Sequence, residues 1–296
     1  MKKCLIIINK AAGGSKRISF EKVEQCLGDV YEYTRRSIPD GPEPDLNGYD
    51  AVAVCGGDGT LGSILSKVYD KPVDVWYFPV GTLNDKAKAE RYEGTKTVCP
   101  SCGGEIKNKQ VVLGRCDGKD NRIFAYVFAA GAFTPIGYTA SVAVKKKIGV
   151  MAYIGRVLEE YKVHRIMAEI DCDGTRYEGE FALIMFVKSP RCFGFGFNKA
   201  FDSESLSGHL VAIRSPKHDG LLGKIEMFFP FFRTFFIGLK REREGKIIFK
   251  KVYRASVTHA EPTVYCRDGE KHTVDKGQHK IAFTRSVCNF NVIEKF

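Results

Sequence analysis

The apolar positions in the first third of the chain follow two alternating periods. Residues 17–27 and 61–69 place apolar side chains at the spacing of an amphipathic helix. The runs between and around them are typical of strands and occupy residues 3–9, 30–36, 51–55 and 73–79. Strand and helix periods that alternate in this way indicate βαβ units. The first third is therefore predicted to be an α/β domain built on a parallel sheet.

After about residue 108 the pattern changes to successive strand-like runs. Asp173-Gly174 lies between two of these runs, as expected of a hairpin turn. Helical spacing returns only in residues 138–161 and 221–237. The second part is therefore predicted to be an antiparallel, β-rich domain, so that the fold class is α/β plus β.

Composition narrows the class of protein but does not identify it. The chain has 296 residues, of which 44% are apolar, and a formal net charge of +11. This charge favours an anionic partner, although a basic enzyme without such a partner fits equally well. The apolar start is too short for a signal peptide and is predicted to be the first strand. With ten cysteines and no secretion signal, the thiols are expected to be reduced in the cytoplasm.

Three turns rich in glycine or in Thr and Asn follow predicted strands. They are NKAAGGSK (9–16), GGDGT (56–60) and VGTLND (80–85). Because parallel strands end at one edge of a sheet, these turns predict a phosphate site there. Gly56, Gly57 and Gly59 can adopt positive φ and carry no Cβ, so their backbone N–H groups can approach phosphate oxygens. The alternative is that each glycine serves only to turn the chain.

The negative charge in the second turn constrains the chemistry. Asp58 would repel a bound phosphate unless a divalent metal or a substrate hydroxyl lay between them. The lysine-containing P-loop pattern is absent. The turn therefore favours phosphoryl transfer assisted by a metal or a base.

The three turns together resemble the diacylglycerol kinase catalytic family. The matching motifs are GGDGT, N-x-x-x-G-G from Asn9 to Gly14, and P-x-G-T-x-N-D from Pro79 to Asp85. Residues 131–161 and 193–214 are similar to further family segments, as is CRDGEKH (266–272). GGDGT alone also occurs in NAD kinases and 6-phosphofructokinases, so the combination is what carries the resemblance.

The resemblance implies two domains with ATP and a lipid meeting in the cleft between them. Residues 1–108 with 286–296 would form the nucleotide-binding α/β domain, and residues 109–285 a β-sandwich that takes the lipid. Asp58 would act near the transferring phosphoryl group, and Asp268 or Glu270 would be the general base. The nucleotide contacts implied are Asn9, Lys10, Ala11, Ala12, Gly13, Thr34, Gly56, Gly57, Asp58, Gly59, Thr60, Leu61, Gly62, Thr82, Asn84 and Asp85. For Asp268-Gly269 the alternative is an ordinary hairpin turn.

The sequence departs from the family at three positions. Lys10 stands where proline is common, and Lys86 where phenylalanine is usual. Ser207 stands where relatives often carry an aspartate of a structural magnesium site. The candidate residues for that site here are Glu204, Ser207 and His209. The catalytic Mg²⁺ that accompanies ATP is expected in any case.

Three other segments leave alternatives open. Cys99 and Cys102 form half of a zinc ribbon or part of a tight surface loop. Residues 225–244 join aromatic to basic residues; a core-packed helix with a charged end is favoured over a membrane-facing element. Residues 145–149 are expected to be a solvated helix face.

These observations favour an ATP-dependent lipid kinase that phosphorylates a hydroxyl of diacylglycerol or a related lipid. It is expected to be cytoplasmic, with peripheral contact to the inner membrane surface. The alternatives are a soluble-substrate kinase similar to NAD kinase and a non-catalytic nucleotide- or lipid-binding relative. Nucleic-acid binding is not expected, because basic and aromatic residues form no recognisable module. The oligomeric state stays open, with a homodimer as one alternative.

Overall fold

The computed structural model describes residues 1–40, 44–92, 109–117, 122–132, 134 and 162–293. The predicted helix at 138–161, the lysines at 145–147 and the Cys99/Cys102 pair lie outside these residues. The chain folds as two compact units. Unit 1 consists of Met1–Val111 and Arg285–Phe296, and unit 2 of Val112–Thr284.

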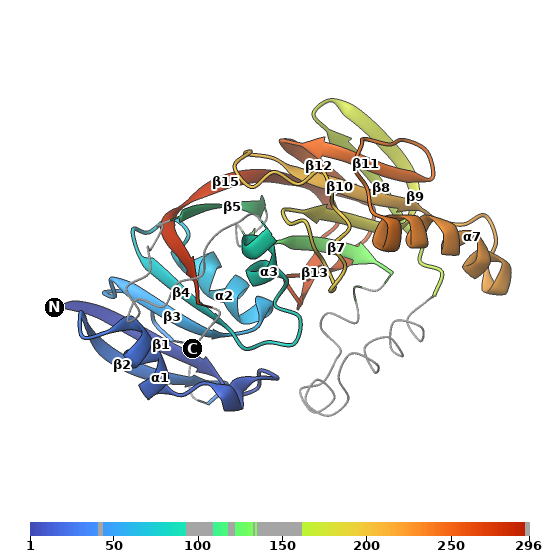
Figure 1. The fold of residues 1–296 in the computed structure, drawn as a ribbon. Helices are drawn as coiled ribbons and strands as arrows, with labels where there is room; N and C mark the ends of the chain where they lie inside the picture. Colours follow the sequence, from blue (N-terminus) through green and yellow to red (C-terminus); the bar gives the residue numbers. More distant parts are fainter. Residues whose placement is uncertain (41–43, 93–108, 118–121, 133, 135–161, 294–296) are drawn as a thin grey trace. The chain divides into compact units, whose positions relative to one another are not determined.

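Unit 1 is built on a parallel sheet with the strand order β2-β1-β3-β4-β15, blue to cyan and red in Figure 1. Its first four strands are β1 (Lys2–Asn9), β2 (Tyr31–Ile38), β3 (Ala51–Gly56) and β4 (Asp74–Pro79). β15 (Gly277–Val292) begins in unit 2, and its last residues pair with β4. Every residue of β3 is buried, as expected of a strand covered on both faces.

The helices of unit 1 lie between successive strands. They are α1 (Phe20–Leu27), which follows the short 3₁₀ turn η1 (Ser15–Arg17), α2 (Asp58–Val68) and α3 (Asp85–Tyr92). The Ser19 hydroxyl accepts a hydrogen bond from the Lys22 amide and so begins α1, and Gly28 at φ 75° ends it. The strands and helices predicted for this region are therefore confirmed, with bounds that differ by a few residues.

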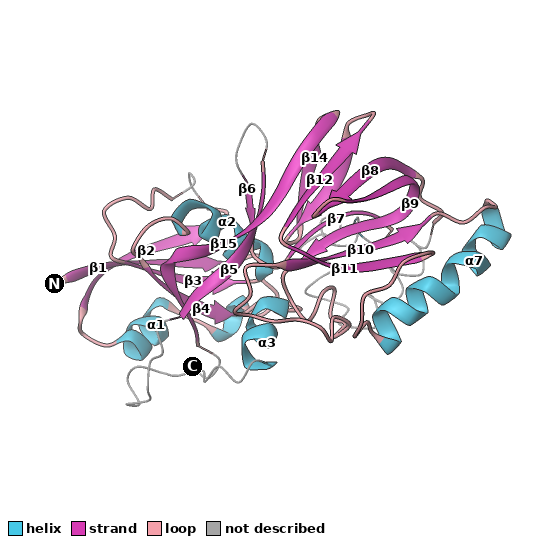
Figure 2. Cartoon of the chain, turned by 90° about the horizontal axis from the view of Figure 1, so that it is seen from above, coloured by secondary structure: helices cyan, strands magenta, loops and turns pink. Residues whose placement is uncertain are grey.

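Unit 2 is rich in β structure, and the pairings among strands β7 to β14 are all antiparallel (Figure 2). The strands are β5 (Lys109–Cys116, which starts in unit 1), β6 (Arg122–Phe124), β7 (Val127–Gly131), β8 (Ile166–Cys172), β9 (Thr175–Val187), β10 (Gly208–Arg214), β11 (Ile247–Val252), β12 (Arg254–His259), β13 (Thr263–Arg267) and β14 (Glu270–Val274). Its core contains the Phe128 ring stacked on Tyr265 at 4.2 Å between centroids. The predicted change of fold class is therefore confirmed.

One helical stretch belongs to the described part of unit 2. α7 (Gly220–Phe232) runs directly into a five-residue π-helix, η3 (Arg233–Ile237). Both views place α7 on the outside of the unit, near strands β9 and β10 (Figures 1 and 2). Among the residues that the structure describes, no helix combines the length and the apolar character needed to cross a bilayer.

Candidate active site

The three glycine-containing turns of unit 1 meet at the carboxyl edge of its parallel sheet. The Asn9 side-chain amide donates a hydrogen bond to the Thr60 hydroxyl at 2.8 Å, which joins the first turn to the second. The backbone N–H of Gly14 donates to the Val80 carbonyl at 2.7 Å, and the Val80 N–H to the Gly56 carbonyl at 3.0 Å. Hydrogen bonds therefore link each turn to the other two.

Glycine is needed here for close approach and not for positive φ. Gly57 has φ −96°, and neither Gly56 nor Gly59 has a positive φ, so these glycines do not use the left-handed conformation that is open to them. A Cβ on Gly81 would lie 2.4 Å from the Gly57 Cα atom. A Cβ on Gly56 would lie 2.6 Å from the Thr60 side chain. Contacts this short exclude a larger residue, so the second and third turns touch through bare backbone.

Asn84 shapes the third turn. It adopts a left-handed conformation at φ 51°, which asparagine tolerates better than most residues. Its side-chain oxygen accepts the Gly81 N–H at 2.8 Å, and its side-chain nitrogen donates to the Gly81 and Pro79 carbonyls. A Cβ on Gly13 of the first turn would lie 3.1 Å from the Thr82 hydroxyl, so these turns are also close.

Asp58 is the first residue of α2 and is only 9% exposed. Its two carboxylate oxygens accept the backbone N–H groups of Asp85 and Lys86, each at 2.9 Å. These amides begin α3, where a negative charge interacts favourably with the positive end of the helix dipole. The single negative charge of GGDGT therefore has a structural role, namely holding the third turn and the start of α3.

The charges beside this contact affect a buried tyrosine. Burial, and then the nearby charges of Asp58 and Asp85, raise the pKa of Tyr77 well above its ordinary value. Tyr77 therefore stays protonated, and its hydroxyl lies 3.5 Å from the Asn84 side-chain oxygen. Asp85 and Lys86 are themselves buried, and the Lys86 ammonium lies 5.9 Å from the centre of the Phe290 ring.

The other residues predicted to contact the nucleotide differ in their burial and in their distance from the turns. The Ala11 N–H donates to the Asn9 side chain, Ala12 is buried, and Leu61 and Gly62 are buried within α2. Lys10 is exposed and pairs with Asp40 at 2.8 Å. Thr34 lies in the middle of β2, opposite Leu5, whereas Asn9 is opposite Ile38. Four residues of strand, about 13 Å, separate Thr34 from that end of the strand, so it is not brought together with the turns.

In unit 2, Asp268 and Gly269 form the tight hairpin loop between β13 and β14, and Glu270 follows it as the first residue of β14. Asp268 has φ 49° and Gly269 φ 95°, a pair of values typical of a two-residue hairpin loop. Asp268 is 2% exposed, and its carboxylate accepts the backbone N–H groups of Ala125, Tyr126 and Val127. Glu270 is exposed at the start of β14. Of the two candidate bases, Asp268 is therefore buried and Glu270 is exposed to solvent.

Burial gives Asp268 an altered acidity. Desolvation raises its pKa from 3.8 to about 6, while the three amide hydrogen bonds act in the opposite direction. A carboxyl with this pKa changes protonation state close to neutral pH, as a general base requires. The hairpin turn and the altered carboxyl therefore occur together at one residue.

The three candidate residues for a structural magnesium site do not fit that role. Glu204 is exposed, and the Ser207 hydroxyl hydrogen-bonds to the Ser205 hydroxyl at 2.8 Å. His209 is buried, stacks on the Phe249 ring, and has a pKa lowered to about 4, mainly by burial and then by nearby lysines. In the described part of the chain, no group of three or more His, Cys, Asp or Glu residues is arranged to hold a metal.

A lysine that sequence reasoning did not single out contacts this segment. Lys188 follows the apolar run of β9 and is 2% exposed. Its ammonium donates to the carbonyls of Asp202 and Ser205, both at 2.7 Å, and lies over the Phe201 ring. The 202–205 turn is therefore held by a side-chain cation. The only sequence signal was a lysine directly after a buried strand.

Comparison with known proteins supports the α/β unit most directly. The family model "Diacylglycerol kinase catalytic domain" matches residues 3–112. A Streptococcus pneumoniae serotype 4 protein named "Putative lipid kinase" is 25% identical over 200 residues, which cover 63% of this chain and 67% of that protein. A Staphylococcus aureus "Diacylglycerol kinase" is 26% identical over 62% of this chain. That match covers 54% of the relative, so the chain spans about half its length.

A solved structure extends the similarity of fold to nearly the whole chain. The crystal structure of a "putative diacylglycerol kinase" from Bacillus anthracis str. Sterne has a TM-score of 0.68 and covers 98% of this chain and 96% of its own. At 15% identity this match shows the shared fold alone. Residues 3–112 are therefore similar to the diacylglycerol kinase catalytic domain family.

Proposed function

We propose that the protein is an ATP-dependent lipid kinase that transfers the γ-phosphoryl group of ATP to a hydroxyl of diacylglycerol or a related lipid. The proposal is supported by the family-model match over residues 3–112 and by one structural observation in unit 1. Three turns that the sequence separates are joined at one sheet edge by hydrogen bonds and glycine contacts. In parallel α/β sheets, this edge is where ligands bind.

The backbone around α2 suits a phosphate group. Gly57 is the N-cap residue, so no side chain at the cap satisfies the first N–H groups of the helix. These donors and the positive end of the helix dipole favour an anion. Lys10 in the first turn adds a positive charge, shared with Asp40. In this proposal, turn amides bind the phosphates and Asn9 and Asn84 hold the turns in place.

A kinase of this type uses Mg²⁺ with ATP, and the donors at the turns are compatible with it. Mg²⁺ prefers oxygen ligands and is usually held by substrate phosphates and one or two carboxylates. Asp58, with the Thr60 hydroxyl nearby in the same turn, would supply such oxygens. The ion would neutralise phosphate charge.

For unit 2 we propose that Asp268 accepts the proton of the lipid hydroxyl. Its raised pKa, about 6, and its fixed orientation support this assignment over the exposed Glu270. The Glu270 carboxylate is the alternative base. The proposed setting is the cytoplasm, with the lipid presented at a membrane surface.

The test is direct labelling of the product. The purified full chain is incubated with Mg²⁺, γ-labelled ATP and a total lipid extract, with NAD as substrate in a parallel reaction. We expect label in a phospholipid and none in NADP. Label only in the NAD reaction would replace the proposal with a soluble-substrate kinase, and no labelled product with intact ATP binding would favour a non-catalytic relative.

A further inference from the structure

The helical segment α7–η3 of unit 2 is apolar on both of its sides. Its inward side is buried through residues that include Met227, Pro230 and Phe231. Its outward side exposes large apolar residues: Leu221, Leu222, Ile225, Phe228, Phe229, Phe232, Phe236 and Ile237. Phe229 is 70% exposed and Phe236 66%. The favoured prediction of a core-packed helix is therefore wrong for this side, which we call the aromatic face.

The rings of the aromatic face are ordered along the helix. Phe228 stacks on Phe232 at 5.7 Å between centroids, and Phe232 stacks on Phe236 at 5.2 Å. This spacing of four residues forms a continuous row across the junction of α7 and η3. A continuous exposed apolar row of this kind marks an interaction site more often than an accident of the surface.

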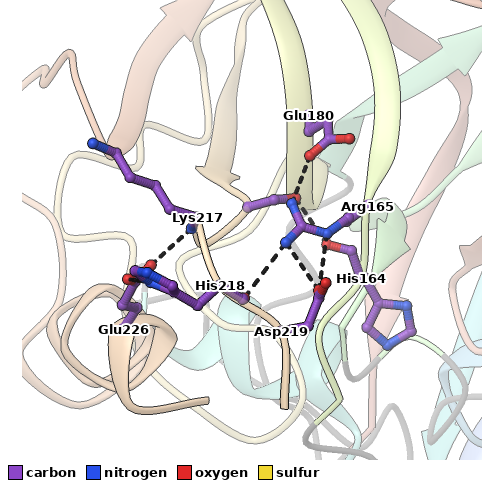
Figure 3. Close-up of polar contacts among 8 residues, drawn as sticks. His164, Arg165, Glu180, Lys217, His218, Asp219 and Glu226 are labelled. Carbon is purple, nitrogen blue, oxygen red and sulfur yellow. Dashed lines mark hydrogen bonds and ion pairs between the residues drawn. The ribbon is translucent and has the colours of Figure 1, made fainter. Parts of the chain in front are cut away.

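The N-terminal end of the helix is anchored to the rest of unit 2 (Figure 3). Arg165 donates to Glu180 of β9 at 2.7 Å and to Asp219, the N-cap residue of α7, at 2.9 Å. About two turns further on, Glu226 accepts the Lys217 N–H at 2.8 Å and contacts the His218 ring. These contacts, with the buried inward side chains, hold the aromatic face outward.

Basic residues border the aromatic face. A groove of about 570 Å³ is lined by apolar Ile225, Phe229 and Pro230 and by the cations Arg233, Arg243 and Lys246. A second groove of about 650 Å³ shares Arg233 and Arg243 and adds Lys199, Lys240 and Arg241.

Three carboxylates, Glu226, Glu242 and Glu244, also line the two grooves, and Glu226 lies 3.9 Å from the Lys246 ammonium. Glu226 contacts Lys217 and His218, and Glu244 accepts the Tyr177 hydroxyl at 3.1 Å. Glu242 accepts the Lys251 N–H at 3.1 Å. The two grooves together are lined by six Lys and Arg side chains and three Glu side chains, so the net charge around the face is positive.

An aromatic row bordered by cations fits a lipid surface better than a second copy of the chain. In a symmetric dimer, the same patch faces itself, so the basic borders would lie against each other. On a bilayer, aromatic rings enter the boundary between headgroups and acyl chains, and adjacent Arg and Lys contact lipid phosphates. The formal charge of the whole chain, +11, also favours binding to an anionic surface.

We propose that the aromatic face of α7–η3 docks the protein on a bilayer that contains anionic lipids, with Arg233, Lys240, Arg241 and Arg243 at the headgroup phosphates. The proposal deepens the proposed function, on which it rests for the role of docking, because a membrane-bound lipid alcohol is reached only at such a surface. Docking itself requires neither ATP nor catalysis, so it can be measured separately.

The experiment measures binding of the full chain to vesicles without ATP. Vesicles of phosphatidylcholine, with and without phosphatidylglycerol, are sedimented with the wild type, with Phe229→Ser/Phe236→Ser, and with Arg241→Gln/Arg243→Gln. We expect the wild type to bind the anionic vesicles. Loss of these two rings, which would be partly buried in the bilayer, should weaken binding by about 10-fold or more. Each removed charge should cost roughly 5-fold, and only on anionic vesicles.

Tyr253→Ser is the matched control, because Tyr253 is an exposed aromatic residue, 51% accessible, outside this face. It should bind as the wild type does, and thermal unfolding verifies that each variant is folded. Equal binding by wild type and the double Phe variant overturns the proposal, as does a wild type that ignores anionic vesicles. A dimer that the Phe variant dissociates, without any vesicle binding, assigns the face to a second copy. Vesicle binding without lipid phosphorylation removes the proposed function and leaves the docking surface.

Discussion

Two hairpins of unit 2 have the same loop dipeptide, Asp-Gly, but differ in the burial of the aspartate. Asp173-Gly174 joins β8 to β9 and has φ values of 49° and 87°; Asp268-Gly269 joins β13 to β14 and has 49° and 95°. Both aspartates accept backbone N–H groups from a distant segment. Asp173 does so from Tyr253 and Arg254 at the surface, whereas Asp268 does so while only 2% exposed.

The difference shows that the loop conformation and the raised pKa of the aspartate have separate causes. Asp-Gly is enough to form the two-residue loop, because both residues tolerate positive φ. The raised pKa of Asp268 results from burial, which the packing of β7 and β13 imposes. Four measurements test this comparison.

The largest expected effect is on catalysis. Asp268→Asn keeps an oxygen acceptor for the amides but removes the proposed base, so kcat/KM for lipid phosphorylation should fall about 10²- to 10⁴-fold. Asp173→Asn is the matched control in the same dipeptide and should keep wild-type kcat/KM. Full activity in Asp268→Asn would falsify the assignment of the base. Loss in Glu270→Gln instead would move that role to Glu270.

The next effect is on stability. Asp268→Ala leaves three buried N–H groups without their acceptor and should lower the free energy of unfolding by about 4 kcal/mol. Asp173→Ala removes two exposed acceptor contacts and should cost about 1 kcal/mol. Urea unfolding at neutral pH measures both. Equal losses would show that burial does not separate the two hairpins.

A third effect depends on pH. The folded protein holds the Asp268 proton more tightly than the unfolded chain, since the pKa rises from 3.8 to about 6. This group therefore stabilises the fold below about pH 4, and that contribution is lost as the pH rises through 6. The loss is roughly 3 kcal/mol.

The difference in unfolding free energy between wild type and Asp268→Asn, followed from pH 4 to 7, isolates this contribution from that of His209. We expect the wild type to lose stability relative to the variant as the pH rises. A constant difference would show that the Asp268 carboxyl titrates normally. In the same range, kcat/KM of the wild type should rise through about pH 6, because only the ionised carboxylate accepts a proton.

The smallest expected effect extends the comparison to unit 1. Asp58 also holds a neighbouring segment by accepting two amides, at the start of α3. Asp58→Asn retains one acceptor oxygen and loses the charge at the helix end, so the free energy of unfolding should fall by about 2 kcal/mol. An unchanged unfolding midpoint would contradict the structural role. Asp40→Asn, at an exposed ion pair of the same unit, serves as the control.

Much of the fold was predictable because its signals are local. The elements of unit 1 follow from apolar spacing, and the meeting of their turns follows from the rule that parallel strands end at one edge. The conformation of the glycine turns was not predictable in the same way. Gly57 and Gly81 matter because their backbones touch across 24 positions of sequence, a contact that no local pattern reports.

The environments of the site residues also depend on contacts that are distant in the sequence. Asp268 is held by amides 141 to 143 positions away, and Lys188 by carbonyls beyond the end of its own strand. The aromatic face is a similar case. Apart from Glu226 and Arg233, residues 225–237 are almost all apolar, a composition that suits a core helix, and only the packed structure leaves one side exposed.

The sequence by itself determined the alternation of strands and helices, the two Asp-Gly loops and the three turns that carry the family motifs. Each of these depends on residues a few positions apart, through periodicity or backbone preference. The tertiary structure alone decided which carboxylate is buried, which lysine lies over the 202–205 turn and which side of α7 is exposed. A side chain is buried by neighbours that come from distant parts of the chain, so its burial is decided only when the chain has folded.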